Sequence, residues 1–153
     1  MPVTNFPDGL TSLGLPVLTS LTYLPVTATM TSATWNTVAA HEILTVTGTC
    51  RIIILPSCTG TLTSAGGTAT LVLGDETTTN SLIASSDAEA LAAGEWWFDT
   101  TMTRTLAAKA LYLDFVVSGK DIGYTIGTEA LTGGSIVFHC FYEAISADGA
   151  VVA

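Results

Sequence analysis

Apolar and polar residues alternate along much of this chain, which is the pattern of β-strands that bury one face. In residues 42–55 the even-numbered positions are mostly apolar. The odd-numbered positions are polar from Thr45 to Arg51 and then become apolar at Ile53 and Leu55. A layer of a β-sandwich has only one core face. The pattern therefore predicts a second cover over the end of this strand, from an N-terminal arm, a loop or another subunit.

Residues 135–145 show the same double coverage. One face carries Ile136, Phe138 and Cys140, and the other carries Val137 and Phe141. In a chain long enough for one domain, this pattern indicates burial against a neighbouring copy, because obligate homo-oligomer interfaces resemble a core cut in half.

Several further short segments have β-forming composition, and Gly- or Pro-containing turns separate them. This spacing predicts an all-β chain with a single, jelly-roll-like β-sandwich. The expected strands are residues 33–39, 42–55, 61–64, 68–74, 82–84, 95–99, 111–118, 122–127 and 135–145.

One segment has a helical signature. Ser86 is followed by Glu89 three residues later and by Gly94 after an Ala-rich run, which is a capping box with a glycine stop. We expect one short helix here, and a weaker helical turn within residues 104–110.

Residues 1–32 are apolar but carry Pro16 and Pro25, and proline confines a strand to a sheet edge or an unpaired arm. We therefore divide the chain into an N-terminal arm, residues 1–32, and a β-sandwich domain, residues 33–153. An arm this apolar needs a surface to lie on, either its own domain or a neighbour.

Charged residues make up only 11% of the 153 residues, and the formal net charge is −9. Such a surface repels phosphate groups, so we expect neither nucleic-acid nor membrane binding. No secretory signal or apolar run of membrane-spanning length is visible, which favours a soluble, cytosolic chain. Three cysteines without a C-x-x-C motif favour buried free thiols; a bridge between Cys50 and Cys58 needs an oxidising compartment.

The sequence offers little chemistry. His41 and His139 lie in no metal-binding or catalytic motif, so we expect no enzyme, no cofactor and no metal site. A calcium site in residues 74–80 matches no known loop spacing, and paired carboxylates that meet only in space stay open. The richest aromatic segment is "EWWFD", residues 95–99, where an outward Trp97 suits an interface anchor or a sugar platform.

Four segments, "HEILTVTGTCRIIILP", "GGTATLVLGD", "LIASSDAEALAAGEWWFD" and "FYEAISADGAVVA", occur in this order over about residues 35–153. Together they resemble small virion proteins of tailed bacteriophages. The resemblance implies a structural role in the virion, as a capsid decoration (cement) protein. Such proteins resemble trimeric β-sandwiches whose arms reach onto capsid subunits.

On this resemblance, the partners are the major capsid protein and two further copies of the chain in a homotrimer. The location is the capsid surface of the virion, with assembly in the host bacterial cytoplasm. For capsid binding by the arm we select Leu15, Leu18, Leu21, Tyr23 and Leu24, and for self-association Ile53, Leu55, Trp97 and Phe141.

Two rival functions remain open. A tail or fibre module that binds host glycans needs outward aromatic side chains around a pocket, for which Trp97 and Tyr124 are the candidates. A sugar-processing enzyme needs converging carboxylates or a histidine-bound metal. Strand order, oligomer symmetry and a head or tail location do not follow from the sequence.

Overall fold

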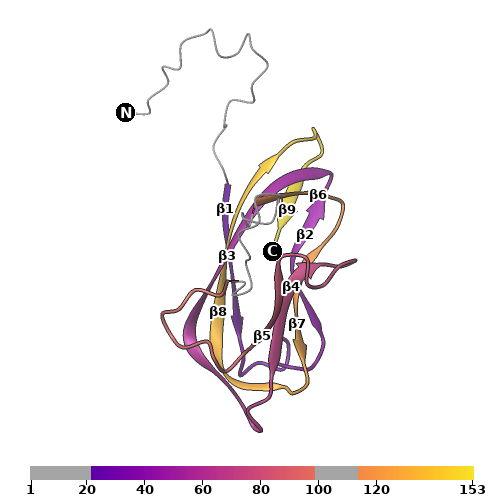
Figure 1. Ribbon diagram of the computed structural model, residues 1–153. Coiled ribbons are helices and arrows are strands. Elements are labelled where there is room, and N and C mark those ends of the chain that lie inside the picture. The colour runs from indigo at the N-terminus through magenta and orange to yellow at the C-terminus, as the bar shows by residue number, and fades with distance from the viewer. Residues whose placement is uncertain (1–21, 99–113) are drawn as a thin grey trace, which may run out of the picture.

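The structure is a computed structural model, and it describes residues 22–98 and 114–153. These residues form two antiparallel sheets and no helix, which confirms the all-β prediction (Figure 1). The strands are β1 (Thr22–Thr29), β2 (Ala40–Thr47), β3 (Thr49–Ser64), β4 (Thr70–Asp75), β5 (Ile83–Asp87), β6 (Asp114–Ser118), β7 (Ile122–Gly127), β8 (Leu131–Ala144) and β9 (Ala150–Val152).

The strands pair in a nested order. β1 pairs with β8, β2 with β7, β3 with β6 and β4 with β5, all antiparallel. The pairs fall alternately into the two sheets, whose orders are β1-β8-β3-β6 and β5-β4-β7-β2-β9. The first eight strands are therefore arranged like one long hairpin that has been folded over itself, with β9 added beside β2.

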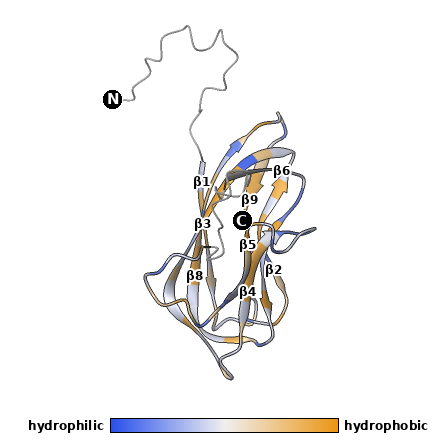
Figure 2. Ribbon diagram, in the orientation of Figure 1, coloured by the Kyte–Doolittle hydropathy of each residue, from blue (hydrophilic) through white to orange (hydrophobic). Residues whose placement is uncertain are grey.

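One hydrophobic core takes side chains from both sheets. Figure 2 shows apolar residues along the strands of each sheet. Tyr124 and Phe138, from opposite sheets, stack in this core with ring centroids 5.4 Å apart. The Tyr124 hydroxyl donates a hydrogen bond of 2.6 Å to the Trp35 carbonyl, and burial raises the pKa of this phenol. A phenol that is fully buried and bonded in this way is part of the core.

The predicted strand over residues 42–55 is in fact two strands in different sheets. The break is at Gly48, whose φ of +61° lies in the left-handed region that favours glycine. The chain crosses there from β2 to β3. Gly48 also has no room for a side chain, because an added Cβ would lie 2.6 Å from Asp148 Oδ1 and from Ser146 Oγ.

We expected this strand to end at Leu55, before Pro56, but β3 runs on to Ser64. On the side of β3 away from β8, the described pairs with β6 run from Thr49 to Ile53. Further along the same side, the Pro56 carbonyl accepts a hydrogen bond of 3.0 Å from Trp97 N. Proline has no N–H to donate, and it is tolerated here because the neighbouring segment on that side bonds only to its carbonyl oxygen.

Three local predictions are wrong. Residues 33–39 form turns and bends, and the expected helix after Ser86 is absent, because β5 continues to Asp87 and turns follow. The backbone of this loop bonds to β3 instead, with Gly94 N donating to Cys58 O at 2.7 Å and Cys58 N donating to Glu95 O at 2.7 Å. Residues 95–98 make only an isolated bridge, between Trp96 and Ser57.

The predicted arm includes a strand of the sheet. Thr22–Thr29 is β1, an edge strand with Pro25 at its centre, and Val26 and Ala28 are buried in the core. The separation of residues 1–32 from the core therefore does not hold for this part. Leu15, Leu18 and Leu21, and the weak helical turn at residues 104–110, lie outside the described residues.

Candidate functional site

The outer face of the four-stranded sheet carries a band of apolar and aromatic side chains. Tyr23 of β1 lies opposite Phe141 of β8, which lies opposite Ile53 of β3; one step along, His139 lies between Pro25 and Leu55. Tyr23 is 48% exposed, and its ring lies 5.0 Å from that of Phe141. We call this surface the aromatic face, comprising Tyr23, Pro25, Ile53, Leu55, Val137, His139 and Phe141.

Trp96 and Phe98 lie beside the aromatic face, beyond β3, and are not part of it. They are 49% and 40% exposed, and their rings stack with centroids 6.4 Å apart. The Trp96 ring also lies 5.5 Å from His139. Trp96 is bridged to Ser57, so it lies beside β3, beyond the described pairs between β3 and β6.

The predicted self-association residues do not all lie on this surface. Ile53, Leu55 and Phe141 are on the aromatic face and partly exposed, whereas Trp97 is 1% exposed and belongs to the core. The Trp97 indole donates to Ser86 Oγ at 3.1 Å. Trp97 was predicted to face outward, but it faces inward, and Trp96 and Phe98 are the outward residues.

The glycan-binding candidates Trp97 and Tyr124 are both buried, so neither can serve as a sugar platform. Of the predicted capsid-binding residues, Tyr23 is on the aromatic face and Leu24 packs partly against the core. Sequence alternation places Trp96 on the face opposite to Trp97, but it does not say which of the two residues faces outward.

His139 holds the centre of the aromatic face together. Its Nδ1 lies 2.7 Å from the Tyr23 hydroxyl, and its Nε2 lies 2.9 Å from Ser57 Oγ. The three side chains come from β1, β8 and β3, so the two hydrogen bonds connect three neighbouring strands across their outer face. This network fixes the orientation of the rings, which prepares the surface for contact at a small entropic cost.

The Ser57–His139 pair also has the distance of a nucleophile and its general base. Acyl transfer further needs two free donors for an oxyanion. Beside Ser57, the amides of Cys58 and Trp97 already donate to the carbonyls of Glu95 and Pro56. The surroundings of Ser57 thus favour a structural hydrogen-bond network over a catalytic pair.

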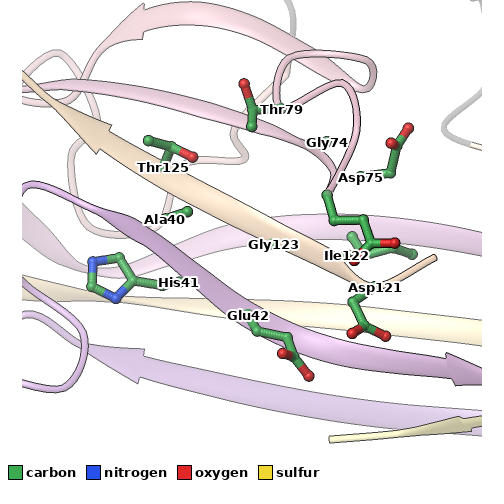
Figure 3. Close-up of a pocket in the computed structure, with 11 residues that line it drawn as sticks. Ala40, His41, Glu42, Gly74, Asp75, Thr79, Asp121, Ile122, Gly123 and Thr125 are labelled. Atoms are coloured by element: carbon green, nitrogen blue, oxygen red, sulfur yellow. The ribbon is translucent and has the colours of Figure 1, made fainter.

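A small cavity of about 120 Å³ lies on the five-stranded sheet (Figure 3). Three of its four carboxylates are already used: Glu42 accepts from the Thr45 hydroxyl, Asp121 accepts from Val46 N at 3.1 Å, and Asp75 accepts from two backbone amides, while Glu76 is the fourth. In Figure 3, the His41 ring lies apart from these carboxylates. The cavity therefore does not have the geometry of a metal or acid–base centre.

His41 has a structural role at this cavity. Its Nε2 bonds to the Thr37 carbonyl at 2.8 Å, and its ring stacks on Tyr124 at 5.0 Å. Asp75, in the proposed calcium loop, is likewise occupied. Partial burial acts to raise its pKa, but hydrogen bonds from Thr78, Thr77 and Ser81, with Lys120 nearby, outweigh burial and lower the pKa.

All three cysteines are buried free thiols, as predicted. Burial raises the pKa of each thiol, and Cys140, which lies near Cys50, reaches about 12. Thiols with raised pKa values in the core act as small hydrophobic side chains rather than as nucleophiles.

Within residues 22–98 and 114–153, no three His, Cys, Asp or Glu side chains are placed to hold a metal ion. The same residues contain no helix with the length and hydropathy needed to cross a membrane.

Comparison of the chain with known protein families, with curated proteins and with solved structures finds no match. The function must therefore be argued from the strand order and from the aromatic face.

Proposed function

We propose that this chain is a virion structural protein of the capsid decoration type: a jelly-roll β-sandwich that forms a homotrimer and attaches to the major capsid protein of a phage head. In this proposal the protein is on the capsid surface after assembly in the bacterial cytoplasm. It stabilises the shell mechanically and catalyses no reaction.

The strand order supports the jelly-roll part. β1 pairs with β8, β2 with β7, β3 with β6 and β4 with β5, and these pairs alternate between the two sheets. Double-sheet jelly rolls have this eight-stranded arrangement of two Greek keys, and viral capsid domains use them, as do lectins and cupins. The fold by itself therefore permits a virion role without selecting it.

The observation that carries the proposal is the contrast between the two outer faces of the same molecule. The outward residues of β2 and β7 are small or polar, such as Glu42, Thr45 and Thr125. No aromatic side chain points outward from β2, β4, β7 or β9, all of which the structure describes in full. Solubility would favour a polar outer face on both sheets, so the aromatic face indicates a surface that is covered in the assembled protein.

A second copy of the chain is the simplest cover. The formal charge of −9 disfavours close approach of copies, and the seven residues of the aromatic face include no Asp or Glu, so that repulsion is reduced there. Tyr23, held by its hydrogen bond to His139, and Phe141, which packs against Tyr23, are aromatic side chains, the class that dominates interface energetics.

The first test is the mass in solution by light scattering. A homotrimer has a mass of about 47 kDa, three times 15.8 kDa. Phe141→Ser in the aromatic face should convert the trimer to a monomer, while Thr125→Ser on the polar outer face should leave the mass unchanged. A wild-type monomer over the whole concentration range would refute self-association.

The second test is attachment to bare heads of the encoding phage, measured by co-sedimentation. The truncation should remove residues 1–21 and no more, because Thr22–Thr29 is a strand of the sheet and its loss would expose the core. We expect the truncated chain to fold and to lose attachment. Attachment by the truncated chain would refute the arm, and no attachment by the intact chain would refute the decoration role.

A further inference from the structure

A cleft of about 600 Å³ lies between the end of β5 in one sheet and the segment beside β3 in the other. One wall is the end of β5, with Ser85, Ser86 and Asp87, and the other is the segment beside β3, with Glu95, Trp96 and Phe98. The volume falls in the range of small-molecule binding sites, roughly 300–1,000 Å³. The cleft is separate from the small cavity of Figure 3, which lies over β2, β4 and β7.

We propose that this cleft binds a neutral saccharide, a function beyond the decoration role. Trp96 and Phe98 carry the apolar part of the site. The two residues are 49% and 40% exposed, and their rings stack with planes 20° from parallel, so they form one aromatic cluster on the wall of the cleft, which we call the ledge. The negative face of an aromatic ring attracts the slightly positive C–H groups that cover one side of a hexose ring.

The ledge is held rigidly. Beneath it, buried Trp97 donates its indole N–H to Ser86 Oγ at 3.1 Å, which ties the Trp96 segment to the opposite wall. Trp97 N also donates to the Pro56 carbonyl at 3.0 Å, and Cys58 N donates to the Glu95 carbonyl at 2.7 Å. Because the backbone on both sides of Trp96 is bonded to β3, its ring does not need to be ordered when a ligand binds.

Carboxylates supply the polar part. Asp87 and Glu95 are exposed, and each uses one oxygen for the backbone: Asp87 Oδ1 accepts from Glu89 N at 3.0 Å and Glu95 Oε2 accepts from Ala92 N at 2.9 Å. The second oxygen of each has no hydrogen-bond partner within the described part of the chain. A carboxylate held in place by one oxygen is well suited to accept a charge-assisted hydrogen bond from a sugar hydroxyl through the other.

The charge selects the class of saccharide. Asp87 and Glu95 line the cleft, and no Lys or Arg is among its described lining residues. Among the described lining residues, a sialylated or uronic-acid sugar would place its carboxylate against two others with no compensating cation. A neutral hexose or N-acetylhexosamine chain meets no such repulsion.

The test is titration of the intact protein with neutral oligosaccharides, namely hexamers of glucose, mannose and N-acetylglucosamine, with an oligogalacturonate hexamer as the anionic probe. Trp emission and saturation-transfer NMR report binding. We expect at least one neutral hexamer to bind, and Trp96→Ala to weaken that binding by about tenfold or more. The variants Asp87→Asn and Glu95→Gln should weaken the neutral hexamer severalfold and reduce discrimination against the anionic one.

Val38→Ala is the matched control. Val38 is 54% exposed, comparable to Trp96, but it lies neither in the cleft nor on the aromatic face, so this variant should bind the hexamer as the wild type does. Light scattering on every variant separates a loss of the cleft from a change of assembly state, so failure here is distinguishable from failure of the proposed trimer. Absence of binding to all three neutral hexamers, or equal binding by Trp96→Ala, overturns the proposal.

Discussion

Trp96 and Trp97 are adjacent residues of the same type with opposite burial, and they allow a direct test of the structure. Trp97 is 1% exposed and donates a hydrogen bond of 3.1 Å to Ser86 Oγ, whereas Trp96 is 49% exposed. Removal of a fully buried Trp side chain costs about 3–5 kcal/mol, including the cavity that it leaves. The Trp96 ring keeps contacts with His139 and Phe98, so its removal should cost about 1 kcal/mol at most.

The assay is urea unfolding followed by far-ultraviolet circular dichroism, because the substitutions themselves change Trp fluorescence. With a slope of about 2 kcal/mol per molar urea, Trp97→Ala should lower the midpoint by about 2 M and Trp96→Ala by no more than about 0.5 M. Trp97→Phe separates the two contributions, since it keeps most of the packing and loses the bond to Ser86. A Trp96→Ala variant that unfolds as early as Trp97→Ala would mean that this segment faces the other way.

Two further predictions concern single contacts. Gly48→Ala should destabilise the protein by about 2 kcal/mol or more, because φ is +61° and the new Cβ would lie 2.6 Å from Asp148 Oδ1. Gly67→Ala is the control: φ is +71°, but nothing lies within 4 Å of the new Cβ, so this change should cost only about 1 kcal/mol. Equal losses in thermal unfolding would contradict the tight crossing at Gly48. Hydrogen bonds from Ser64, Gly66 and Thr68 lower the pKa of Glu129 below its ordinary 4.5. The wild type should therefore be more stable than Glu129→Gln at pH 7, and the difference in stability should shrink as the pH falls below 4.5. A difference that does not change between pH 7 and pH 3, in urea unfolding, would show that the charge is not involved.

Strand existence could be predicted from the sequence wherever one face alternates cleanly. β7 was predicted with its observed bounds, because Ile122, Tyr124 and Ile126 alternate with Gly and Thr, and turn residues flank them. The sheet crossing at Gly48 could not be predicted, since Val46, Gly48 and Cys50 keep the even phase through the break. A glycine in a strand pattern signals a possible special backbone position, but only the surrounding strands decide whether the chain turns there.

The false helix shows how non-local pairing overrides a local signal. The capping-box residues Ser86 and Glu89 have the correct spacing, yet Ser86 pairs with Leu71 of β4, and its hydroxyl accepts from Trp97 Nε1. Ala88 is buried in the core and bonds to Ala69. Two turns of helix are marginal without packing, whereas here the strand pairing and the core contacts act together.

The candidate site was predicted only in part for a similar reason. Periodicity places Trp96 and Trp97 on opposite faces, but it cannot say which face is inward when both carry a tryptophan. The inward side is decided by the bridge between Trp96 and Ser57, because Ser57 is in the outward phase of β3. That pairing joins residues far apart in the chain, so no local pattern reports it.

The change from polar to apolar in residues 42–55 now has a structural reason. Thr45 and Thr47 point outward from β2, on the polar outer face of the five-stranded sheet. After the crossing at Gly48, Ile53 and Leu55 occupy the outward positions of β3, on the aromatic face of the other sheet. Thr49 and Arg51, the first outward positions of β3, are still polar, so the change falls within β3 and not at the crossing. Ile53 and Leu55 lie opposite Phe141 and His139 of β8, and the odd-numbered positions therefore become apolar where the strand joins the aromatic face.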